Sequence, residues 1–122
     1  MTETVVLVFE DPAFGLSDLA ASIQQPYVVA QNAGVVSISR DSQVCYVVAV
    51  DDIEVEGIFE DWPEASIPKQ PGAIFSIDYR DPKLLVGIVR DLASRRSFLV
   101  DTNYGRVVSG STLTEDLVTL RP

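Results

Sequence analysis

The chain of 122 residues contains no histidine. The imidazole side chain is the commonest general base and metal ligand in proteins, so its absence excludes the usual histidine-dependent catalytic and metal sites. The sequence also lacks a Gly-x-Ser-x-Gly nucleophile motif and the glycine-rich loops that bind nucleotide phosphates. We therefore interpret the protein as non-enzymatic and expect no catalytic residues, no cofactor and no metal.

Cysteine is nearly as scarce, because Cys45 is the single cysteine of the chain. One thiol cannot form an internal disulfide or a thiolate zinc site. Cys45 lies within the apolar run of residues 44–48, with no cation nearby in the sequence to stabilise a thiolate. We predict a buried structural thiol.

Long hydrophobic runs are missing as well. No apolar stretch approaches the roughly 20 residues that a membrane-spanning helix needs. The first residues, Met-Thr-Glu-Thr, show neither the basic segment nor the cleavage site of a signal peptide. These observations predict a cytoplasmic protein without a membrane partner.

Basic residues are few: nine Lys and Arg stand against 18 Asp and Glu, for a net charge of −9. Residues 1–68 hold twelve of the acids and one base, whereas residues 69–122 hold six acids and eight bases. Phosphates would be repelled by the acidic part, so nucleic acid is not an expected partner. A protein with a basic surface is a better candidate partner. The alternative is that the acidic charge only keeps the protein soluble.

The apolar patterns predict strands at residues 4–9, 27–30, 35–39 and 44–50 in the first half. A helix is predicted at about residues 15–25, with Ser17 as its N-cap. Asn32-Ala33-Gly34 predicts a tight turn, because these residue types tolerate positive φ.

The second half repeats this order. Strands are predicted at residues 73–79, 97–100 and 106–109, and residues 113–120 form either a last strand or a short helix. Asp81 and Pro82 predict the start of a helix over residues 82–95. Its buried stripe is Leu85, Ile88, Val89 and Leu92, and Arg90, Arg95 and Arg96 lie on its solvated side.

Residues 27–36 also align without a gap on residues 98–107, with matching aromatic, aliphatic, Asn, Gly and Val positions. The sequence therefore predicts a single α+β domain over residues 1–122, built from two similar β-α-β-β(-β) halves. The halves cover about residues 1–50 and 73–122, and residues 51–72 connect them. We expect an antiparallel or mixed sheet with the two helices on one face.

Paired modules of this order resemble the vicinal-oxygen-chelate superfamily, which includes glyoxalase and bleomycin-resistance proteins. That superfamily binds metal through His and Glu, and this chain has no His. The resemblance therefore implies a metal-free protein that sequesters a small ligand.

The connection is the candidate binding segment. Residues 51–64 hold seven acids and no base, together with the only tryptophan, Trp62. In protein interfaces a tryptophan often anchors the contact, while flanking acids select a basic partner. The candidate partner-binding residues are Asp52, Glu54, Glu56, Phe59, Glu60, Asp61, Trp62 and Glu64.

The alternating acids Asp52, Glu54 and Glu56 lack the spacing of a calcium-binding loop, so we interpret them as solvated or facing a partner. Our main hypothesis is an acidic inhibitor, of the kind of an immunity protein that binds and neutralises a bacterial toxin. The alternatives are the ligand-sequestering protein and a phage-type inhibitor that mimics the charge of nucleic acid.

Overall fold

The computed structural model describes residues 2–51, 59–60, 62–67, 72–102 and 106–119. These residues form a seven-stranded antiparallel sheet with three short α-helices, which confirms the predicted α+β class. None of the described helices is long and apolar enough to cross a bilayer.

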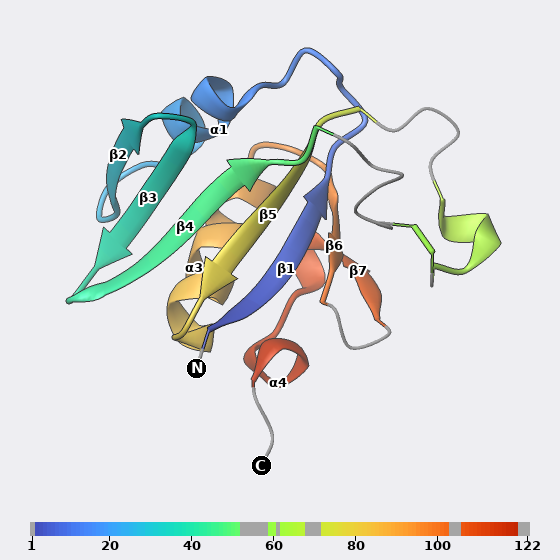
Figure 1. Ribbon diagram of the computed structural model, residues 1–122. Helices are drawn as coiled ribbons and strands as arrows, with labels where there is room; N and C mark the ends of the chain where they lie inside the picture. Colours follow the sequence, from blue (N-terminus) through green and yellow to red (C-terminus); the bar gives the residue numbers. More distant parts are fainter. Residues whose placement is uncertain (1, 52–58, 61, 68–71, 103–105, 120–122) are drawn as a thin grey trace.

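Most of the strands come before the longest helix along the chain (Figure 1). In chain order the elements are β1 (Glu3–Val8), α1 (Leu16–Ser22), β2 (Val28–Asn32), β3 (Val35–Arg40), β4 (Gln43–Ala49), the 3-10 turn η1 (Glu64–Ser66), β5 (Ile74–Tyr79), α3 (Pro82–Ala93), β6 (Leu99–Asp101), β7 (Val107–Ser109), the 3-10 turn η2 (Gly110–Thr112) and α4 (Glu115–Val118).

The sheet has the order β2-β3-β4-β5-β1-β6-β7. Its centre is the pairing of β1 with β5, in which Val5 lies opposite Ile77 and Leu7 opposite Phe75. The hairpins β2-β3 and β6-β7 lie at the two ends, so β2 and β7 are the edge strands.

Two-residue turns join β2 to β3 and β3 to β4. Ala33 and Gly34 both have positive φ, as the predicted tight turn requires. Asp41 and Ser42 also have positive φ, at 52° and 70°, although neither is a glycine. This backbone conformation is unfavourable for most side chains, and the tight pairing of Arg40 with Gln43 maintains it.

Helix α3 begins as the sequence predicts. Asp81 is the N-cap and its carboxylate accepts a hydrogen bond from the backbone N–H of Lys83 at 3.1 Å, with Pro82 in the first turn. Leu85, Ile88 and the other members of the predicted stripe are buried. The prediction for α1 was wrong in detail, because Gly15 is its N-cap, and the Asp18 carboxylate accepts from the Gly15 N–H at 2.8 Å.

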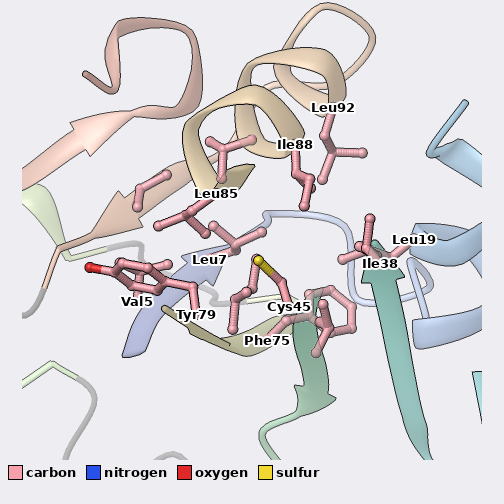
Figure 2. Packing of buried hydrophobic residues seen from close by; sticks show 14 of the residues in the cluster. Val5, Leu7, Leu19, Ile38, Cys45, Phe75, Tyr79, Leu85, Ile88 and Leu92 are labelled. Atoms are coloured by element: carbon pink, nitrogen blue, oxygen red, sulfur yellow. The ribbon is translucent and has the colours of Figure 1, made fainter. Parts of the chain in front are cut away.

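Two apolar clusters hold the sheet. The larger one joins Leu19 of α1 and Leu85 of α3 to side chains such as Leu7 and Cys45 (Figure 2). The smaller one lies on the opposite side of β1 and β5, since Val8 and Ile74 form it with Trp62. Adjacent side chains of a strand point to opposite faces, so the same two strands supply both clusters.

The strand order does not confirm two similar halves. In the first half, the outer strand is the first strand of the hairpin, β2, whereas in the second half it is the second strand, β7. Residues 110–118 contain η2 and α4 instead of a third returning strand. The duplication, with paired helices on one face, and the resemblance to the vicinal-oxygen-chelate modules therefore remain unconfirmed.

Cys45 is buried between the sheet and α3, as predicted (Figure 2). Its surroundings are apolar, and burial raises the pKa of its thiol to about 12, with a smaller contribution from the charge of Asp81. The side chain is therefore a neutral packing group, and it is not a nucleophile at neutral pH.

This raised pKa predicts how stability changes in alkali. The thiol favours the folded state fully below its unfolded pKa near 9, and this contribution is lost as the pH rises towards 12. The free energy of unfolding should fall by up to about 1.4 kcal/mol per pH unit above pH 9 because of this group. Urea unfolding of the parent and of Cys45→Ala between pH 8 and 11 isolates the contribution of the thiol. If the free energy of unfolding changes equally with pH in both proteins, the assignment is contradicted.

Candidate functional site

The structure describes half of the predicted binding residues. Asp52, Glu54, Glu56 and Asp61 lie outside the described residues, and their part in binding stays a prediction. Phe59, Glu60, Trp62 and Glu64 are described, and the sequence predicted that all four would face a partner.

Trp62 is buried on the sheet and does not project into solvent. Its exposed fraction is 7%, and it packs on Val8 and Ile74 in the smaller cluster. Its indole Nε1–H donates a hydrogen bond to Asp101 Oδ2 at 2.8 Å, and its ring meets that of Phe59 edge-on at 4.8 Å between centroids. The sheet offers the indole both an apolar surface and a carboxylate acceptor, which accounts for its burial. The sequence alone left open whether Trp62 would face a partner or pack on the core.

The neighbouring acids do face solvent. Asp51, Glu60 and Glu64 are exposed, and Glu64 lies in the first turn of η1. Trp62 therefore holds the segment on the sheet while the acids beside it remain available for contact. Of the predicted binding residues that the structure describes, the acids Glu60 and Glu64 are exposed, whereas Phe59 is half-buried and Trp62 is buried.

A second surface was missed by sequence reasoning. The face of the sheet that carries Tyr46, Val48 and Val28 has no described helix over β2, β3 and β4 (Figure 1). These side chains are the exposed large hydrophobics of the described residues, at 49%, 36% and 65% exposure. Strand β4 is apolar on both faces, so its sequence does not show that Cys45 and Val47 point inward while Tyr46 and Val48 point outward.

This open face continues across the sheet in polar residues. Tyr46 lies opposite Ser37 on one side and Asp78 on the other, and the exposed Asp78 carboxylate accepts a 2.6 Å hydrogen bond from the Thr4 hydroxyl. A hollow of about 310 Å³ lies beside these residues, and Tyr46, Asp78 and Arg80 help to line it. The face therefore combines an exposed aromatic, aliphatic neighbours and a carboxylate.

A larger pocket of about 500 Å³ lies where α3 meets the start of β2 and the β3–β4 turn. It is lined by Tyr27, Arg40, Asp41, Gln43, Asp81, Lys83, Leu84, Val86, Gly87 and Arg90. The volume is in the range of small-molecule sites. Sequence reasoning placed Arg90 on a solvated helix face and had no signal that Tyr27 and Arg40 would lie beside it.

Gly87 shapes the floor of this pocket. A Cβ at position 87 would clash with the Tyr27 hydroxyl oxygen, so glycine allows that hydroxyl to approach the helix. Glycine within a helix costs about 1 kcal/mol relative to alanine. The contact with Tyr27 is a structural reason for a glycine at position 87, because the contact positions the tyrosine between α3 and Arg40. The Arg40 guanidinium carbon lies 5.9 Å from the centroid of the Tyr27 ring.

No protein family, curated protein or solved structure matches the chain. Its function must therefore be inferred from its own geometry. The described residues contain no group of three or more Cys, Asp or Glu side chains arranged to hold a metal ion.

The position of Trp62 makes it important for stability. Trp62→Ala should lower the free energy of unfolding by about 3–5 kcal/mol, because it removes a buried aromatic from the smaller cluster. Trp62→Phe should cost less, because it keeps a ring and loses the hydrogen bond to Asp101. Urea unfolding followed by circular dichroism measures both changes, and parent-like stability of Trp62→Ala would show that the indole does not pack on the sheet.

The contact of Gly87 with Tyr27 predicts a coupled effect on stability. In the parent, the clash of Gly87→Ala with the hydroxyl oxygen should cancel or exceed its helix-propensity gain of about 1 kcal/mol. In a Tyr27→Phe background the nearest atom of residue 27 is the ring Cζ, at an ordinary 3.6 Å, so the same change should stabilise the protein. Thermal unfolding of the four proteins forms the double-mutant cycle, and equal effects of Gly87→Ala in both backgrounds would refute the contact.

Proposed function

We propose that the protein is a non-enzymatic binding protein that recognises a basic protein surface, in the manner of an immunity protein that neutralises a bacterial toxin. The observation that carries the proposal is the open face of the sheet, with Tyr46, Val48 and Val28 exposed upon it. Exposed apolar side chains grouped on one face and bordered by polar residues are typical of protein interaction sites.

Tyr46 is the anchor in this proposal. It is half exposed at 49%, and its strand is fixed on both sides by β3 and β5. A tyrosine on a rigid strand loses little conformational entropy on binding, and its hydroxyl provides a polar contact beside the apolar ring. It takes the anchoring part that the sequence analysis assigned to Trp62.

The charge near this face selects the partner. Asp78 lies directly beside Tyr46 in the sheet, and the exposed Glu60 and Glu64 belong to the segment that packs on the same face through Trp62. With a net charge of −9, the chain attracts a basic partner over long range and accelerates the encounter. The predicted contributions of Asp52, Glu54, Glu56 and Asp61 would add to this field.

We assign no reaction to the chain. It contains no histidine, and its one thiol is buried and protonated at neutral pH. A stoichiometric inhibitor needs only a complementary surface and a stable fold, and both can be tested without knowing a substrate.

The experiment begins with the partner that the parent protein retains from a lysate of its source organism. With that partner purified, Tyr46→Ala should raise the dissociation rate at least about tenfold, which is the effect of losing an interface anchor. The double variant Glu60→Gln/Glu64→Gln should associate more slowly than the parent at low salt. The two association rates should converge as the salt concentration rises, because salt screens the charges.

The matched control for charge is Glu10→Gln/Glu115→Gln, which removes two exposed acids that belong neither to strands β2–β4 nor to the segment around Trp62. It should leave association near the parent rate. If the two double variants change association equally, Glu60 and Glu64 act only through the net charge of the protein. If Tyr46→Ala binds with the kinetics of the parent, the open face is not part of the interface. Retention of nucleic acid alone would contradict a protein partner.

A further inference from the structure

The pocket beside α3 concentrates positive charge in a strongly acidic protein. Three of its lining residues, Arg40, Lys83 and Arg90, are among the nine basic residues of the chain. Lys83 and Arg90 are seven positions apart on α3, with Gly87 between them, so all three share one face of the helix. Tyr27 and Arg40 approach that face from the start of β2 and the end of β3.

Two of these cations have no acidic partner in the part of the chain that the structure describes. Lys83 and Arg90 form no ion pair with a described residue. In contrast, the two described arginines just after α3 form ion pairs. Arg95 pairs with Asp91 at 3.1 Å, and Arg96 pairs with Asp11 at 4.0 Å. Unbalanced positive charge is therefore specific to the pocket side of the helix.

The two acids of the pocket reduce this positive charge but do not cancel it. Asp41 lies in the exposed turn, 3.5 Å from the Arg40 Nε, and its side chain is 86% exposed. The Asp81 carboxylate caps α3 by accepting from the Lys83 backbone N–H. Both carboxylates keep their negative charge, so three cations against two carboxylates leave a net charge of +1 on the lining. Neither carboxylate forms an ion pair with Lys83 or Arg90, whose charged groups can therefore contact a ligand.

Apart from the amide of Gln43, the rest of the lining is apolar or aromatic. Leu84 and Val86 are almost fully buried, and the Tyr27 ring is half-buried beside them. An inorganic anion would contact only the cations, whereas a ligand with an anionic end and an apolar body would cover both parts. Arginine and lysine side chains together bind phosphate groups well, because they supply charge and several hydrogen-bond donors.

We infer that this pocket binds a small organic phosphate of about mononucleotide size, with its phosphate held by Arg40, Lys83 and Arg90 and its body against Tyr27. The site lies on the side of the sheet that α3 covers, opposite the open face of the proposed protein interface. Gly87 determines the shape of the pocket, because the absence of a side chain there lets the Tyr27 hydroxyl lie close against α3.

The test is isothermal titration of the full chain with adenosine monophosphate, inorganic phosphate and adenosine. The monophosphate should bind with measurable heat, phosphate should bind at least tenfold more weakly, and adenosine should bind more weakly still. Arg90→Gln and Lys83→Gln should each raise the dissociation constant of the monophosphate about tenfold or more, the usual effect of losing one charge-assisted contact.

Arg95→Gln is the matched control, since it removes one positive charge just beyond the C-terminal end of the same helix, outside the pocket. It should leave the dissociation constant within about twofold of the parent. Unfolding temperatures of the unliganded variants confirm that each is folded. Failure of all three compounds to bind at millimolar concentration, equal binding of adenosine, or an equal loss in Arg95→Gln would overturn the inference.

Discussion

The antiparallel pairing of β1 with β5 is the constraint on which the rest of the structure depends. It joins segments about 70 residues apart at the centre of the sheet and fixes their register. In that register Val5 and Leu7 face the larger cluster while Val8 and Ile74 face the smaller one. A slip of one residue would turn each set to the opposite face, so both clusters depend on this one pairing.

The two clusters give the molecule two unlike surfaces. The larger cluster needs α3 as a cover, and the outer side of that helix carries Lys83 and Arg90 at the edge of the pocket. The smaller cluster is covered by the segment around Trp62, which leaves Tyr46 and its neighbours on β3 and β4 exposed. The proposed protein interface and the proposed phosphate pocket thus arise from one asymmetry, the unequal covering of the sheet.

Local sequence signals identified most of the elements because they depend on near neighbours. Asp81 and Pro82 define the start of α3 through contacts within one turn, and Ala33-Gly34 defines a hairpin through backbone sterics. The prediction of Ser17 as the N-cap of α1 was wrong, even though a helix cap also depends on near neighbours in the sequence. Asp18 reaches back to the Gly15 N–H, so the helix begins earlier than the serine suggested.

The sequence by itself determined the α+β class, the positions of the main strands and the buried stripe of α3, because each follows from side-chain periodicity. It also indicated that Cys45 is buried, because the thiol lies in an apolar run with no cation nearby in the sequence. Only the tertiary structure decided the strand order, the burial of Trp62 and the meeting of Tyr27 with Gly87. These features require contacts between residues tens of positions apart. Periodicity shows that a side chain needs an apolar partner, but the pairing of distant strands decides which partner it meets.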